Sequence, residues 1–501
     1  MREFYEQIKW NHQRSKSNLI NFKLISYVLG ILLLVEGGMF LICAGISLCY
    51  NEPDYIYFIY TLGINVAVGS ILLLCGKNAK TQTNRRDGFF IVSTTWLLFT
   101  LFGMLPFYIS GHIPSITDAF FETMSGFTTT GATILDNIES LPNGMLFWRS
   151  FTQWIGGLGI VIFTIAFLPI FSGSNQQLFQ SEATGVTQSK IQPRIQVMAR
   201  YLWIIYIVLT LTETILLVLG GMSLVDAVCH SFSTTATGGF STKQASVEYF
   251  NSAYIEYVIA IFMIISGVNF ALYYWVVKGR FRQLWKDSEI RWFLKSVGIL
   301  TLIITIALVV CNGYDVETAF RKSLFQVATC HTSCGFASAD YNLWPQFTWM
   351  LLLFAMISGG CTGSTSGGVK SMRLIIMWRN IVNHFKQLLH PHAVLPVRVN
   401  GIAQPVEVSA RVFTFFTTYL ICIFVGWTLL MAMGVGMTES LGTVISSIGN
   451  VGPGMGSFGP AFSWADLPDA AKWVLSTLMF LGRLEIFGIL LLFYKGFWKD
   501  I

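Results

Sequence analysis

The sequence predicts an all-α integral membrane protein: two N-terminal transmembrane helices, followed by four repeats of helix, re-entrant pore loop and helix around one central pore. Three observations support this fold class. The 501-residue chain is 53% hydrophobic and only 12% charged. Apolar runs of about twenty residues, the length that crosses a bilayer, recur along it. Four loops rich in glycine and hydroxyl side chains separate these runs at similar intervals.

Ten membrane spans are expected. An even number of spans places both termini on the same side, and the polar, basic start of the chain (1–23) does not fit a short cleavable signal. We therefore expect both termini in the cytoplasm. The expected spans cover residues 24–49, 56–75, 89–109, 146–170, 201–219, 254–277, 292–311, 347–378, 412–433 and 473–494.

The basic residues indicate the orientation, because cytoplasmic connections carry an excess of Lys and Arg. Lys77, Lys80, Arg85 and Arg86 follow the second span, whereas the preceding "NEPD" connection has no basic residue. The same excess returns at Lys190, Arg194 and Arg200, and then within 278–295 and 370–411. Acidic residues are expected on or near the outer side: Asp118, Glu122, Asp136, Glu139, Asp226, Glu248, Asp315, Glu317, Asp340, Asp466 and Asp469.

A repeated plan follows the first two spans: an apolar span, a short semi-apolar segment, a glycine- and hydroxyl-rich loop, and a second span. Gly131, Gly238, Gly335 and Gly452 mark the four loops. Each short segment is interpreted as a half-helix that ends at its loop inside the membrane. The expected divisions are 1–86 for the N-terminus and leading helices, then 87–200, 201–295, 296–400 (with a broken second helix) and 401–501 for the repeats.

Four such loops around one axis fit the binding of a dehydrated cation. Non-helical backbone survives at membrane depth only where protein buries it or it lines water. Backbone carbonyls then supply ligands on all sides, and each half-helix directs the negative end of its dipole toward the loop. A single loop of this composition would fit an ordinary extracellular turn, in which Gly, Ser and Thr are common. Four loops in repeat register favour a pore.

The chain resembles the Trk/Ktr/HKT potassium transporter superfamily, and specifically its TrkH-like membrane subunits. The motifs "TTTGAT", "STTATGGFST", "TSCGFAS" and "GNVGPG" and the tail "FLGRLEIFGILLLF" carry this resemblance, which covers nearly the whole chain. The resemblance implies a K⁺ selectivity filter made by each marked glycine and the two residues before it. Sodium-selective relatives have serine at the first glycine, so Gly131 favours potassium. The implied filter residues are Thr129, Thr130, Gly131, Ala236, Thr237, Gly238, Ser333, Cys334, Gly335, Asn450, Val451 and Gly452.

The stretch "SGGCTGSTSGGVKS" interrupts the span after the third loop, because its glycines and hydroxyl residues do not continue a membrane helix. Gly363 and Gly368 have the spacing of a phosphate-binding loop, but Val369 separates Gly368 from Lys370, which argues against a nucleotide site. The resemblance implies a gate below the filter; a plain hinge is the alternative. The candidate gate residues are Gly359, Gly360, Thr362, Gly363, Ser364, Thr365, Ser366, Gly367, Gly368 and Lys370.

Arg483 lies in the middle of the last expected span, where an unpaired charge costs about 3 kcal/mol or more. It must therefore face protein or water. Glu485 is two positions away on a different helix face, so the two side chains are not expected to pair along the helix. The resemblance places Arg483 beneath the filter as a barrier in the pore, and a structural salt bridge to another span is the alternative.

The resemblance implies K⁺ uptake across a prokaryotic cytoplasmic membrane by a homodimer that works with a cytosolic nucleotide-binding subunit of TrkA type. K⁺ is then the transported ion, and no organic cofactor and no nucleic-acid partner are expected. A symporter that couples K⁺ to Na⁺ or H⁺ remains an alternative. An enzyme is not expected, because facing acid, base or metal ligands are not found inside the apolar segments apart from Arg483 and Glu485.

Overall fold

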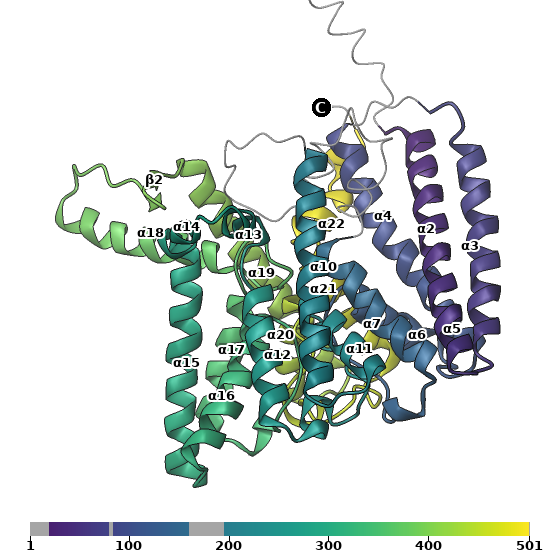
Figure 1. The fold of residues 1–501 in the computed structure, drawn as a ribbon. Helices are drawn as coiled ribbons and strands as arrows, with labels where there is room; N and C mark the ends of the chain where they lie inside the picture. The colour runs from purple at the N-terminus through teal and green to yellow at the C-terminus, as the bar shows by residue number, and fades with distance from the viewer. Residues whose placement is uncertain (1–19, 80–83, 160–194, 500–501) are drawn as a thin grey trace, which may run out of the picture.

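The computed structural model describes residues 20–79, 84–159 and 195–499, and these residues form a bundle of helices with one two-residue hairpin (Figure 1). The predicted all-α membrane fold is confirmed. Within the described ranges, six helices are long and apolar enough to cross a membrane, and two bent helix pairs reach the same length together.

The two leading helices, α2 (Phe22–Cys49) and α3 (Tyr55–Cys75), pack against each other along their length at one edge of the molecule (Figure 1). Small residues allow this approach: a Cβ on Gly30 would lie 2.8 Å from the carbonyl oxygen of Gly69 on the partner helix. Glycine is favoured at such contacts because membrane helices associate mainly through close packing.

Four repeats follow, and each has a first helix, a half-helix and a second helix. Repeat 1 comprises α4 (Arg85–Gly103), α5 (Leu105–Ile109), α6 (Ile116–Phe127) and α7 (Asn143–Leu158). Repeat 2 comprises α10 (Ile195–Leu219), α11 (Leu224–Thr235), α12 (Ala253–Ser266) and α13 (Phe270–Val277), and α14 (Phe281–Lys286) leads on. Repeat 3 comprises α15 (Ser288–Asn312), α16 (Val316–His331), α17 (Gln346–Ser358) and α18 (Ser371–Leu389). Repeat 4 comprises α19 (Val406–Ala432), α20 (Met437–Gly449), α21 (Asp469–Arg483) and α22 (Phe487–Phe493).

Short elements complete the chain. One 3-10 turn follows the loop of each repeat, and the hairpin joins repeats 3 and 4. These elements are η1 (Ile138–Ser140), η3 (Ser246–Phe250), η4 (Tyr341–Leu343), η5 (Gly456–Phe458), η6 (Lys495–Phe497), β1 (Arg398–Val399) and β2 (Ile402–Ala403). The expected divisions at 200/201 and 295/296 fall inside α10 and α15, so each of these repeats begins several residues earlier than predicted.

The half-helices α6, α11, α16 and α20 have 12, 12, 16 and 13 residues. At about 1.5 Å per residue they are too short to cross a hydrocarbon core of about 30 Å. Three begin with a side-chain cap, from Ser115, Ser223 and Asp315, and all four carry an acidic residue in the first turn. Caps and acidic residues at a helix N-terminus satisfy free amides and the dipole, so the sequence starts each half-helix locally.

Two predicted spans are not single straight helices. The span at 254–277 is α12 and α13, bent by 98°, and the span at 473–494 is α21 and α22, bent by 114°. The span at 347–378 is broken as expected, but its second half, α18, continues to Leu389. Within the span at 146–170, α7 ends at Leu158, and residues 160–170 lie outside the described part of the chain, as do Lys80, Lys190 and Arg194.

Both described ends of the chain lie at the same end of the molecule. The backbone amide of Asn21 donates to Asp87 in the first turn of α4, and Arg86 donates to the carbonyl oxygens of Gly496 and Lys499. The helices α14 and α18 and the hairpin lie at this end too, whereas the half-helices occupy the opposite half of the bundle (Figure 1). We call this the basic end, because it carries Lys286, Arg291, Arg379 and Arg398.

Candidate functional site

The four loops after the half-helices share one backbone conformation. Each loop turns through one left-handed residue where its half-helix ends, with φ of 54°, 53°, 54° and 52° at Thr129, Thr237, Ser333 and Asn450. The amide of the next residue then donates back to the carbonyl oxygen five positions earlier: Thr130 to Ser125, Gly238 to Ser233, Cys334 to Thr329 and Val451 to Ser446. The loops are therefore equivalent residue by residue.

This equivalence corrects the predicted register in repeat 2. The glycines with positive φ that follow the shared turn are Gly131, Gly239, Gly335 and Gly452, at 84°, 79°, 95° and 106°. Gly239, rather than Gly238, therefore corresponds to the other three marked glycines. Ala236 caps α11 and corresponds to Thr128, so the triplet equivalent to Thr129, Thr130 and Gly131 is Thr237, Gly238 and Gly239.

The four loops contact one another in a closed ring. Each marked glycine faces the backbone of the next repeat so closely that a Cβ would not fit. At three positions an added Cβ would lie 2.1 Å from a carbonyl oxygen of the next loop: Gly131 against Gly238, Gly239 against Cys334, and Gly335 against Val451. At the fourth position, a Cβ on Gly452 would lie 2.7 Å from the carbonyl oxygen of Thr130. Since real Cβ atoms do not approach an oxygen this closely, glycine is required at all four positions. We call these eight residues the filter ring.

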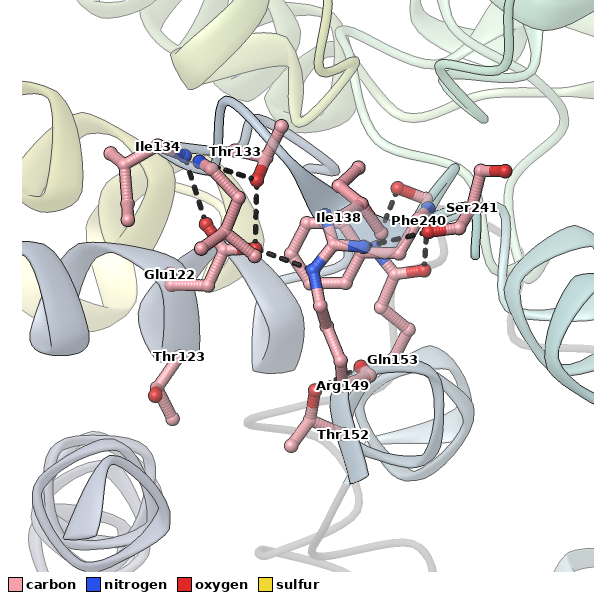
Figure 2. Close-up of polar contacts among 12 residues, drawn as sticks. Glu122, Thr123, Thr133, Ile134, Ile138, Arg149, Thr152, Gln153, Phe240 and Ser241 are labelled. Carbon is pink, nitrogen blue, oxygen red and sulfur yellow. Dashed lines mark hydrogen bonds and ion pairs between the residues drawn. The ribbon is translucent and has the colours of Figure 1, made fainter. Parts of the chain in front are cut away.

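A buried ion pair supports the ring between repeats 1 and 2 (Figure 2). The Glu122 carboxylate on α6 accepts from Arg149 Nε on α7 at 2.6 Å, from Thr133 Oγ1 at 3.0 Å and from the Ile134 amide at 3.0 Å. Arg149 also donates to the carbonyl oxygen of Ser241 at 2.8 Å. Removing one partner of such a buried pair costs about 3–5 kcal/mol, so this pair fixes the first two loops relative to each other.

This pair was not predicted from the sequence. Glu122 was expected on or near the outer side, and the structure adds that its side chain is fully buried within the protein. Arg149 was not singled out, although a guanidinium within an apolar span is by itself a sign of function. The two partners are 27 positions apart in the sequence, so no local pattern would join them.

The expected gate residues form a compact loop between α17 and α18 that lies against the filter ring. Thr365 Oγ1 donates to the carbonyl oxygen of Thr235 at 3.1 Å and accepts from Thr237 Oγ1 at 3.3 Å. The Gly367 amide donates to Ser333 Oγ, and a Cβ on Gly367 would lie 2.1 Å from the carbonyl oxygen of Gly449. The loop thus contacts the ends of three half-helices.

Side chains hold this loop on its other side. The Glu289 carboxylate, at the start of α15, accepts from the Thr362 amide at 2.6 Å, from Thr362 Oγ1 at 2.8 Å and from the Met372 amide at 3.0 Å. Lys370 Nζ donates to the carbonyl oxygen of Ser366 within the loop. A helix, rather than a strand, precedes the loop, which is not the setting of a phosphate-binding loop.

Arg483 connects this loop to repeat 1. Its guanidinium donates to the carbonyl oxygen of Thr365 at 3.0 Å and to that of Gly157 at 2.8 Å, and also to that of Gly156. The helix was expected to continue past Arg483, but it ends there, and Glu485 and Ile486 have φ of 52° and 59°. Glu485 instead pairs with Arg373 on α18 at 2.8 Å.

The model of the TrkH family, described as a cation transport protein, matches residues 57–500. The Trk system potassium uptake protein TrkH of Salmonella typhimurium is 37% identical over 96% of this chain and 100% of the relative, and its Escherichia coli K12 namesake is 36% identical over the same shares. The crystal structure of the potassium transporter TrkH from Vibrio parahaemolyticus superposes with a TM-score of 0.87 at 36% identity, over 95% of this chain and 100% of that one. The chain is a multi-pass membrane protein and belongs to the TrkH family of cation transport proteins.

Proposed function

We propose that this protein takes up K⁺ through a selectivity filter made by the filter ring and the residues that precede it. The closed ring of four equivalent loops is the observation that carries the proposal, because it brings backbone carbonyl oxygens of all four repeats together and leaves no space for side chains at the contacts. The relatives' names, Trk system potassium uptake protein, support K⁺ as the ion. The proposed filter residues are Thr129, Thr130, Gly131, Thr237, Gly238, Gly239, Ser333, Cys334, Gly335, Asn450, Val451 and Gly452.

The electrostatics of the ring favour a cation over an anion. The C-terminal ends of all four half-helices lie at the ring, and that end carries roughly half a negative elementary charge. Neutral carbonyl oxygens can replace the water shell of an ion without holding it as tightly as a carboxylate would. K⁺ is therefore cargo that passes through, driven inward by about 2.3 kcal/mol for each 100 mV of membrane potential.

The loop from Gly359 to Lys370 is the proposed gate. It lies against the ends of three half-helices and is held by Arg483 and Glu289. In the proposed closed state it obstructs the pore at the ring. A cytosolic nucleotide-binding subunit of TrkA type is the proposed regulator. We propose that it contacts the basic end, whose excess of Lys and Arg favours a cytoplasmic location.

The proposed homodimer forms on the exposed face of α18. This helix extends sideways from the body at the basic end (Figure 1). Trp378, Ile381, Phe385 and Leu388 follow helical spacing along it and are 56%, 43%, 63% and 65% exposed. A continuous apolar face of this kind, next to a polar surface, is typical of a contact with another protein chain, and a second copy is the occupant that we propose.

Rubidium flux tests this function. The purified protein is reconstituted into proteoliposomes, and ⁸⁶Rb⁺ uptake is measured with and without an imposed Na⁺ or H⁺ gradient. We expect uptake that follows the K⁺ gradient and the membrane potential alone. Uptake that requires a Na⁺ or H⁺ gradient would instead establish the coupled symporter. Absence of flux in every condition, both from the folded protein and from a folded variant that lacks residues 362–366 of the proposed gate, would reject both.

A further inference from the structure

The second loop of the filter ring is held from behind by two side chains of the preceding repeat. Gln153 and Arg149 lie one turn apart on α7, and both reach the loop segment that follows Gly238 (Figure 2). Gln153 Nε2 donates to the carbonyl oxygen of Gly238 at 2.7 Å, and its Oε1 accepts from the Phe240 amide at 3.0 Å. Arg149 Cζ lies 3.8 Å from the centre of the Phe240 ring. Both side chains are buried, so these contacts are shielded from water.

Gln153 and Gly238 fit each other sterically. A Cβ on Gly238 would lie 2.4 Å from Cδ and 2.5 Å from Oε1 of Gln153, so the amide occupies the space that a side chain at position 238 would need. The equivalent ring positions carry Thr130, Cys334 and Val451, which pack with side chains of their own. Repeat 2 therefore uses an amide from a neighbouring helix where the other repeats use a side chain of the loop itself.

The hydrogen bond is also specific to this repeat. Among the residues that the structure describes, the carbonyl oxygens of Thr130, Cys334 and Val451 accept no hydrogen bond from a side chain. The carbonyl oxygen of Gly238 is thus the one ring oxygen in the described chain that a side-chain donor fixes. That same oxygen contacts Gly131 of repeat 1, so Gln153 acts at the junction of two repeats.

We propose that Gln153 is a positioning residue that sets the preference of the filter for K⁺ over Na⁺. The proposal rests on the proposed function of the ring as a filter. Na⁺ is smaller than K⁺, so it is bound well only if the surrounding oxygens move inward. A side-chain donor bonded to the Gly238 carbonyl oxygen opposes that movement and keeps the opening at the size of the larger ion. Without the donor, the Gly238 carbonyl oxygen loses its side-chain partner, and the glycine has no side chain of its own to pack; its amide keeps only the bond to Ser233 that the other loops also have.

The test is the Gln153→Met variant, which keeps an unbranched side chain of similar length but has no amide. The matched control is Gln326→Met: Gln326 is also fully buried, and its Nε2 donates to the carbonyl oxygen of Ala339 at 2.8 Å, outside the ring. Because a buried hydrogen bond contributes about 1 kcal/mol, we expect the K⁺ to Na⁺ permeability ratio of Gln153→Met to fall about fivefold. Rubidium flux per folded dimer should persist, and the ratio of Gln326→Met should stay at the wild-type value.

The melting temperature and size-exclusion profile of both variants are recorded, since a purely structural role would lower stability alike in the two. An unchanged ratio in Gln153→Met overturns the proposal, as does an equal fall in Gln326→Met. Gly131→Ser is measured in the same assay, so that a failure of the role proposed for Gln153 can be distinguished from a failure of the proposed filter. If Gly131→Ser alters the ratio and Gln153→Met does not, the role of Gln153 is rejected and the filter stands; if neither does, the filter is rejected.

Discussion

In the filter ring, backbone atoms of four equivalent loops contact one another. The loop at 359–370, however, has a counterpart in no other repeat within the described residues, and it is held largely by side chains. The ring glycines leave no space for a Cβ against the neighbouring carbonyl oxygens. The loop, in contrast, depends on the Glu289 carboxylate, the Thr365 hydroxyl and the Arg483 guanidinium. Backbone contacts of close-packed loops change only if the loops move together, but hydrogen bonds of side chains can be broken one at a time.

The second helices show how such a loop could arise at this position. In repeat 2 the second helix breaks between Ser266 and Phe270, and in repeat 4 between Arg483 and Phe487. In repeat 3 the break extends from Ser358 to Ser371. The breaks also meet: the Cys361 amide donates to the carbonyl oxygen of Gly267, and Arg483 donates to that of Thr365. The loop is thus an expanded form of a break that other repeats also contain.

Deleting residues 362–366 should have the largest effect on flux. The loop is held by several side-chain hydrogen bonds worth about 1 kcal/mol each. If three of them favour closure, removal of the loop raises basal rubidium flux about 100-fold without the regulator. Flux is measured in proteoliposomes, after size-exclusion chromatography has shown that the dimer is intact. A folded deletion variant that conducts no faster than the wild type would mean that the loop is a hinge and not a gate.

Gly131→Ser should have the next largest effect, and on selectivity rather than on gating. Its Cβ would lie 2.1 Å from the Gly238 oxygen, and forcing a side chain into a packed site costs about 1–3 kcal/mol. We expect the K⁺ to Na⁺ permeability ratio to fall roughly 30-fold, for a cost near 2 kcal/mol. The matched control is Gly63→Ser on α3, where an added Cβ has no atom within 4 Å. A wild-type ratio in the Gly131 variant would remove this residue from the filter.

Most of the elements that form the filter ring and the loop at 359–370 could be predicted from the sequence, because the patterns that indicate them are local. The four half-helices, their loops and the interrupted helix at 358–371 follow from segment length, caps and runs of glycine. The register of repeat 2 could not be predicted, because "TGG" offers two adjacent glycines and only the positive φ of Gly239 identifies the equivalent one.

Long-range and strained features were also missed. The pairing of Glu122 with Arg149 depends on tertiary packing alone. The bend after Arg483 places Ile486 at φ of 59°, a conformation that β-branched residues rarely adopt, so no local preference indicates it. The structure has to supply both features, and both lie at the site.

Arg483→Gln tests whether charge or hydrogen bonding dominates beneath the ring. A cation that passes at about 8 Å from the guanidinium is repelled by about 2 kcal/mol at an effective dielectric of 20, and by less in a wet pore. We expect rubidium flux to rise about tenfold, for a net change near 1.4 kcal/mol. Arg483→Lys keeps the charge but loses the planar fork of donors. If the charge of Arg483 repels the ion, flux stays slow in the lysine variant. If Arg483 acts instead by hydrogen bonding to the carbonyl oxygens of Thr365 and Gly157, flux is fast in both variants.

Thr365→Val should have the smallest effect, because it removes a single hydroxyl from the gate and keeps the shape of the side chain. The hydroxyl donates to the carbonyl oxygen of Thr235 and accepts from Thr237 Oγ1, so it is the direct side-chain link between the loop and the second filter loop. Losing about 1 kcal/mol of closing free energy should raise basal flux about fivefold and leave the K⁺ to Na⁺ ratio unchanged. Thr348→Val is the control, since its buried hydroxyl donates to the carbonyl oxygen of Pro345, away from the loop. A changed K⁺ to Na⁺ ratio in Thr365→Val would show that the loop at 359–370 also determines selectivity. The loop and the filter ring would then not act separately, contrary to the comparison above.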